Sequence, residues 1–105
     1  MITELQAALR NYPPNFEWFV LLCPTPAAAL EHSRMLGVLL PREAKFSGRT
    51  ALVQDKRISI AAASDAVFIP PDVPFALGLI GWGATAGSEA QTWQARASLL
   101  VNTDR

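Results

Sequence analysis

The chain has few of the residues on which catalytic, metal-binding and disulfide-bonded proteins depend. Its 105 residues include one cysteine, Cys23, and one histidine, His32. A single cysteine cannot form a disulfide bond within the chain, and one cysteine with one histidine supplies too few ligands for a zinc site. We therefore expect no metal and no cofactor.

Positive charge is also scarce. Nine basic residues balance nine acidic ones, and the only lysines are Lys45 and Lys56. A net charge of zero argues against nucleic acid or a membrane surface as the main partner, because both favour an excess of Lys and Arg. Charged residues make up 17% of the chain and hydrophobic residues 50%. This balance favours self-association or docking to a protein partner.

Long hydrophobic runs are missing as well. No stretch reaches the roughly 20 apolar residues that a helix needs to cross a bilayer. Residues 1–6 have neither the basic nor the apolar region of a signal peptide, so we expect a cytoplasmic location. At this length we expect a single domain over residues 1–105.

The first third of the chain is expected to contain two helices and a strand. Leucine and alanine recur at helical spacing over residues 3–11 and again over residues 26–36. Thr25 is a suitable N-cap for the second helix, and Gly37 is expected to end it. Between the helices, residues 16–23 are apolar on both faces and are expected to form a central strand.

The rest of the chain is expected to be mostly strands, with loops at residues 41–48 and 83–91. Residues 92–101 alternate apolar and polar side chains, as a half-buried strand does. The other strands are expected at residues 38–40, 50–54, 57–62, 66–69 and 75–82, with a hairpin at Asp55-Lys56. The predicted fold class is α+β: two N-terminal helices packed on a mostly antiparallel, curved sheet of about five or six strands.

Residues 66–88 are the most apolar part of the sequence, with Asp72 as their only charged residue. Prolines and glycines break the stretch into short pieces, and the two predicted helices offer little surface to cover it. We therefore expect a partner, or a second copy of the chain, to do so. The candidate interface residues are Phe75, Leu77, Leu79, Ile80 and Trp82.

Four residues are candidates for contact with a small-molecule ligand. Trp82 and Trp93 flank the loop expected at residues 83–91, where two indoles could stack on an apolar ligand. Arg96 is the best charged candidate, and His32 lies at the edge of the apolar stripe of its helix. The alternatives are that Trp93 belongs to the core and that His32 is a hydrogen-bonded surface residue.

Two further hypotheses concern reactive side chains. Cys23 precedes a predicted helix N-terminus, which can lower the pKa of a thiol. Its position resembles that of the redox cysteine in thioredoxin-like proteins, although no second cysteine follows. Asp65 and Asp72 could form an acid–base pair, but both positions favour turns.

The leading functional hypothesis is a small non-enzymatic binding or assembly protein that acts as a homo-oligomer or docks to a protein partner. The alternative is a small-molecule binding or catalytic domain with an apolar pocket near Trp82 and Arg96. A redox role through Cys23 is a third possibility. No catalytic residues are assigned.

Overall fold

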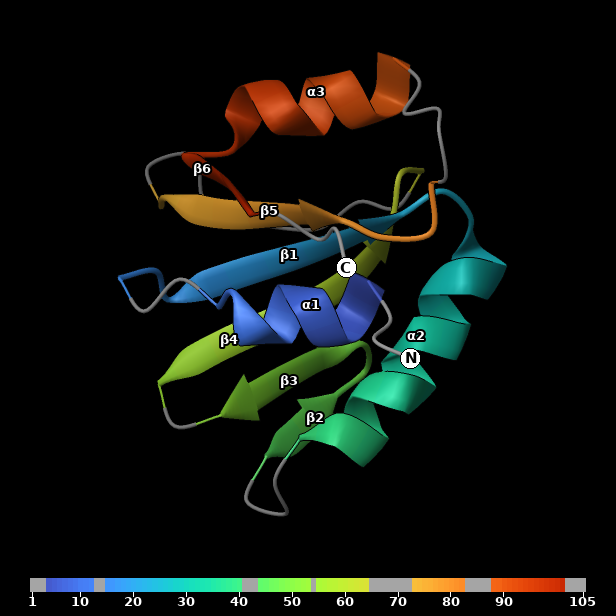
Figure 1. Cartoon of the computed structure of the whole chain (residues 1–105), viewed down its shortest axis with the longest axis vertical. Helices are drawn as coiled ribbons and strands as arrows, with labels where there is room; N and C mark the ends of the chain where they lie inside the picture. Colours follow the sequence, from blue (N-terminus) through green and yellow to red (C-terminus); the bar gives the residue numbers. More distant parts are fainter. Residues whose placement is uncertain are drawn as a thin grey trace.

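The computed structural model describes residues 4–12, 15–40, 44–53, 55–64, 73–82 and 88–101, with the backbone alone for Ser88 and Glu89. This part of the chain mixes three helices with a six-stranded sheet (Figure 1). In chain order the elements are α1 (Glu4–Arg10), β1 (Trp18–Cys23), α2 (Pro26–Leu39), β2 (Lys45–Ser47), β3 (Thr50–Val53), β4 (Lys56–Ala62), β5 (Phe75–Leu79), α3 (Ser88–Arg96) and β6 (Leu99–Val101).

The sheet is mixed, so the prediction of a mostly antiparallel sheet is wrong. Its strand order is β2-β3-β4-β1-β5-β6. The strand β1 runs parallel to both β4 and β5, and β6 runs parallel to β5, while β2, β3 and β4 are antiparallel neighbours. Parallel neighbours need a long crossover connection. The crossover between β5 and β6 is α3, a helix that the sequence analysis did not anticipate.

The central position predicted for the first strand is confirmed. All residues of β1 except Trp18 are buried, and β4 and β5 flank the strand on either side. A strand in the middle of a parallel region is covered on both faces, which explains why its sequence is apolar throughout. The predicted hairpin is also confirmed, as β3 pairs with β4, but Lys56 is not in its turn as expected: it is the first residue of β4 and pairs with Val53.

Helix α2 begins as predicted and ends later. The Oγ1 atom of Thr25 accepts a hydrogen bond from the amide of Ala28 at 3.2 Å, so the N-cap is confirmed. The helix continues through Gly37 to Leu39, so the predicted end at Gly37 and the strand at residues 38–40 are wrong. Glycine ends a helix when it adopts a positive φ, and Gly37 does not. The helix stops at Leu40 because that residue precedes a proline.

The predicted strand at residues 92–101 is wrong. Half of that segment, residues 92–96, belongs to α3, and only Leu99–Val101 forms a strand. Ala90 and Trp93 of the helix pack against the sheet, as does Ala97 directly after it, and the spacing of three and four residues between them is helical. The alternation was misleading because two of its apolar members, Ala95 and Ala97, are small residues that suit a helix well.

Two predicted loops are also corrected in part. Lys45–Ser47 in the loop expected at residues 41–48 is strand β2, and residues 88–91 in the loop expected at residues 83–91 belong to α3. The strand expected at residues 66–69 lies outside the described residues. The strand expected at residues 75–82 is shorter, ending at Leu79.

The helices lie on opposite faces of the sheet (Figure 1). Helices α1 and α2 cover one face, where Leu5, Ala8, Ala29 and Leu36 pack on Phe19, Leu21 and Ile60. Helix α3 covers part of the other face, where Ala90 and Trp93 pack on Val20, Phe75 and Leu77. None of the helices in the described residues is long and apolar enough to cross a membrane.

Candidate functional site

The carboxyl ends of the parallel strands β1, β4 and β5 lie together along one side of the sheet, here called the carboxyl edge (Figure 1). In open α/β sheets, ligands bind outside this edge, where the connections that follow neighbouring strands leave for opposite faces. Here α2 follows β1 on one face, and α3 follows β5 on the other. The topology therefore makes this edge the first place to look for a site.

His32 lies at this edge beside Cys23, the last residue of β1. Its Nδ1 atom is 2.8 Å from the carbonyl oxygen of Ala28 and 3.9 Å from the Sγ atom of Cys23. A carbonyl oxygen can only accept a hydrogen bond, so Nδ1 carries a hydrogen atom and donates a hydrogen bond to the carbonyl oxygen of Ala28. In this arrangement Nδ1 cannot take a proton from the thiol of Cys23.

The thiol itself is poorly suited to reaction. Cys23 is fully buried, and this burial raises its pKa from 9.0 to about 12. The positive charge of Arg49 lowers the pKa and the negative charge of Glu4 raises it, but both effects are smaller than that of burial. A protonated, buried thiol is a weak nucleophile, which argues against the redox hypothesis.

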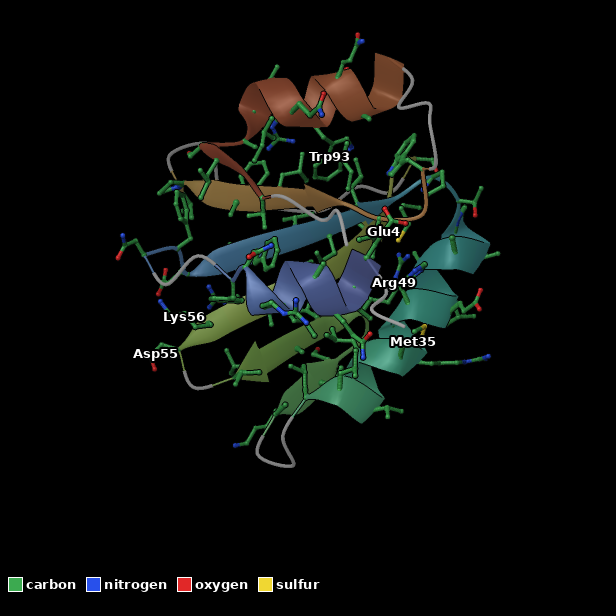
Figure 2. All side chains as sticks on the ribbon, viewed as in Figure 1. Glu4, Met35, Arg49, Asp55, Lys56 and Trp93 are labelled. Carbon is green, nitrogen blue, oxygen red and sulfur yellow. The ribbon has the colours of Figure 1, made fainter. Side chains whose placement is uncertain are left out.

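Hydrogen bonds that involve side chains help to hold the segment that follows β5 against the same edge. The amide of Gly81 donates to Oε1 of Glu4 at 3.2 Å, and Nε1 of Trp82 donates to the carbonyl oxygen of Leu22 at 2.8 Å. Figure 2 shows Glu4 at the end of α1 nearest this edge. Gly81 has a φ of +78°, a conformation that favours glycine. The indole N–H of Trp82 is therefore used within the fold.

Trp93 and Arg96 both come from α3. The side chain of Trp93 is 7% exposed and lies between the helix and the sheet (Figure 2). Its Nε1 atom donates to the carbonyl oxygen of Ala63 at 3.4 Å. The guanidinium carbon of Arg96 lies 5.8 Å from the ring centroid of Trp93 and 5.9 Å from that of Phe75. These are core and cation–π contacts, and a ligand role for either residue stays a prediction.

The four candidate ligand residues do not share one place. Trp82 bonds to Leu22, which is paired with Leu79 at the end of β5. Arg96 contacts Phe75 at the start of the same strand. Leu79 and Phe75 are four residues apart on β5, which corresponds to about 13 Å along the strand. The structure thus brings His32 and Trp82 to the carboxyl edge and places Arg96 toward the opposite end of β5.

The candidate interface residues are largely covered by the chain itself. Phe75, Leu77 and Ile80 are 3%, 1% and 0% exposed, while Leu79 and Trp82 are half-buried. Helix α3 supplies part of the cover that the sequence analysis sought in a partner. An interface through these five side chains stays a prediction. Asp65 and Asp72 lie outside the described residues.

A cavity of about 310 Å³ was missed by the sequence analysis. It lies between the carboxyl-terminal ends of α1 and α2 and the β3–β4 hairpin. Five aliphatic side chains line it together with Tyr12 and Lys56: Leu9, Leu39, Leu40, Val53 and Ile58. No local pattern marks such a site, because its walls come from separate segments of the chain.

Tyr12 forms part of the cavity wall and has an unusual environment. Its ring meets that of Phe19 edge-on, with 5.4 Å between the centroids. Its hydroxyl is closed off from solvent and has no hydrogen-bond partner among the described residues. Burial raises the pKa of Tyr12 from 10.0 to about 12, so the phenol is neutral at physiological pH.

Within the part of the chain that the structure describes, no three His, Cys, Asp or Glu side chains gather in a way that could hold a metal ion. No protein-family model, curated protein or solved structure matches the chain.

Proposed function

We propose that the protein is a small non-enzymatic binding or assembly protein that acts as a homo-oligomer, and that β6 joins the copies. The observation that carries this proposal is the exposure of β6. Its side chains Leu99 and Leu100 are 41% and 55% exposed. Among the described strands, β6 pairs only with β5, so it forms one edge of the sheet.

The two edge strands of the sheet, β2 and β6, differ in charge. At the other edge, β2 carries Lys45 among its three residues, and an edge lysine discourages pairing with another chain. The sequence of β6 is Leu99-Leu100-Val101, without a charged residue. An uncharged, apolar edge strand is a template for strand addition. The proposed contact is therefore at β6 and not at β2.

A two-fold axis beside β6 would pair the strands of two copies and extend the sheet across both. The register of β6 with β5 places Leu100 beside Leu77 on the face that α3 covers, and Leu99 beside Ala76 on the face that α1 and α2 cover. Both faces of the junction would thus gain apolar contacts. Leu99 and Leu100 are 41% and 55% exposed, so burying the rest of each would contribute about half of the roughly 1.5–3 kcal/mol that full burial of a leucine contributes. This gain offsets part of the entropic cost of association.

The proposal is tested by the mass of the protein in solution. Light scattering after size-exclusion chromatography, at tens of micromolar protein, should give twice the mass of a single chain. Leu100→Lys should give a single chain, because it places a charge in the proposed junction. The matched control is Phe46→Lys on β2, where Phe46 is 44% exposed; it should leave the dimer intact.

Circular dichroism on each variant shows whether the change acts on folding or on association. A folded Leu100→Lys variant that keeps the wild-type mass, or a wild type that is monomeric at these concentrations, would contradict assembly through β6. If Leu100→Lys fails to fold, Leu99→Lys gives the same test from the opposite face of the strand.

A second function, the binding of a small molecule, is favoured by the cavity next to α1 and α2. The pocket expected near Trp82 and Arg96 has less support, because their contacts on β5 are separated by about 13 Å.

A further inference from the structure

The walls of the cavity are mostly apolar, so they favour a ligand that is mostly apolar. Its aliphatic lining comes from the end of α1, the end of α2 and the β3–β4 hairpin. The phenol of Tyr12 adds an aromatic surface, and its hydroxyl is closed off from solvent. A volume of about 310 Å³ is at the lower end of the range for ligand pockets, roughly 300–1,000 Å³. The occupant must therefore be small and largely apolar.

The register of the hairpin places one charged residue, Lys56, in this lining. Lys56 pairs with Val53, so both side chains leave the sheet on the same face, as does Ile58 two residues further along β4. Lys56 is the only charged residue among the described residues that line the cavity. The other lysine, Lys45, pairs with Leu52 on the opposite face. The lining thus combines an apolar interior with a single cation.

We propose that this cavity binds a small aliphatic carboxylic acid, with its hydrocarbon chain against the leucines of α1 and α2 and its carboxylate beside Lys56. The limited volume favours a free medium-chain acid over a two-chain lipid. The neutral state of Tyr12 adds no negative charge that would repel the carboxylate. This inference goes beyond the proposed assembly function, because the cavity and β6 involve different residues.

Four probes separate the contributions of chain length and head-group charge. Octanoate, 1-octanol and octylammonium share one chain and differ in charge, and hexanoate is shorter by two methylenes. Each is titrated, below its micellar concentration, into ¹⁵N-labelled protein and followed by NMR. Octanoate should shift the amides of Leu9, Leu40 and Val53 and saturate. Hexanoate should bind about fifteenfold more weakly, and octylammonium at least about fivefold more weakly.

Two matched pairs of variants locate the site. Lys56→Met should weaken octanoate about fivefold and leave 1-octanol unchanged, whereas Lys45→Met should change neither. Leu39→Asp, at the rim of the cavity, should weaken all the probes at least about tenfold. Leu52→Asp is its control, because Leu52 points to the opposite face and the two leucines are 38% and 40% exposed.

Three results would overturn the inference. The first is equal affinity for octylammonium and octanoate, which would mean that Lys56 does not select the head group. The second is an equal effect of Lys45→Met and Lys56→Met, or of Leu52→Asp and Leu39→Asp. The third is the absence of saturable binding by the wild type, since Tyr12 and the leucines would then line a cavity without an acid ligand.

Discussion

At the scale of single residues, Tyr12 and Trp82 differ in whether the polar atom of the side chain has a hydrogen-bond partner. The hydroxyl of Tyr12 is buried and has no partner among the described residues. The indole nitrogen of Trp82 donates to the carbonyl oxygen of Leu22 at 2.8 Å. A buried polar group without a partner costs free energy, whereas a satisfied one contributes a little stability. Removing the two polar atoms should therefore have effects of opposite sign.

Tyr12→Phe should raise the free energy of unfolding by about 1 kcal/mol, because it removes a desolvated hydroxyl and keeps the edge-on contact with Phe19. Urea denaturation measures the change. Trp82→Phe is the contrast and should lower the free energy of unfolding by about 1 kcal/mol or more, through the lost hydrogen bond and the smaller ring. A Tyr12→Phe variant less stable than the wild type would mean that the hydroxyl has a partner.

At the scale of elements, α2 shows how a glycine can be misinterpreted from sequence. Gly37 lies inside the helix, with no positive φ. A Cβ atom added there would lie 3.8 Å from Cζ of Phe46, which is an ordinary contact. Gly81 differs, since its φ is +78°. Glycine is thus required at Gly81 and is a conformational cost at Gly37.

Gly37→Ala should raise the free energy of unfolding by about 0.5–1 kcal/mol, because alanine restricts the unfolded chain and fits the helix without strain. Gly81→Ala should lower it by about 1 kcal/mol or more, because an alanine is strained at that φ. Thermal unfolding of both variants, compared with the wild type, measures the two effects. A stabilising Gly81→Ala or a destabilising Gly37→Ala would show that the two backbone conformations are not those described.

The sequence predicted the elements whose pattern is determined locally. The N-cap at Thr25, the buried strand β1 and the β3–β4 hairpin are confirmed, since each depends on residues close together in the chain. The parallel pairing of β1 with β4 and β5 was not predicted, because no local pattern specifies which strands meet. Helix α3 was missed because small alanines produced a false alternation in residues 92–101.

Which of the candidate residues lie together could not be predicted from the sequence either. His32 and Trp82 do lie at one edge of the sheet, near Cys23. Their proximity follows from the parallel arrangement of β1 and β5, which the sequence analysis did not foresee. The cavity beside Lys56 depends on where two helices end and where a hairpin turns. Spacing along the chain carries no information about such a junction.

At the scale of the whole molecule, the two faces of the sheet are covered unequally. Two helices lie on one face and one on the other (Figure 1). Cys23 and Tyr12 both pack in the cluster beneath the two helices, and burial raises the pKa of each to about 12. The folded molecule therefore keeps both groups protonated at pH values where the unfolded chain releases their protons. This difference links the stability of the whole fold to alkaline pH.

The stability of the protein should accordingly be flat in pH near neutrality and fall above about pH 9. Below that pH, the Cys23 thiol is protonated in both the folded and the unfolded state and contributes no slope. Between its ordinary pKa of 9.0 and the folded value of about 12, only the unfolded chain loses the proton. The free energy of unfolding then decreases by at most about 1.4 kcal/mol per pH unit from this one group. Above about pH 10, Tyr12 adds a decrease of the same sign.

Urea unfolding curves from about pH 7 to about pH 10.5 measure this slope. Cys23→Ala should be less stable than the wild type at pH 7, because it leaves a cavity in the core, and its stability should fall less steeply above pH 9. Tyr12→Phe is the matched variant: it should keep the slope that begins at pH 9 and lose the part that begins at pH 10. A thiol that is buried in the fold must stay protonated for the folded state to persist. If the free energy of unfolding fell equally steeply above pH 9 in the wild type and in Cys23→Ala, Cys23 would ionise as readily in the folded chain as in the unfolded one.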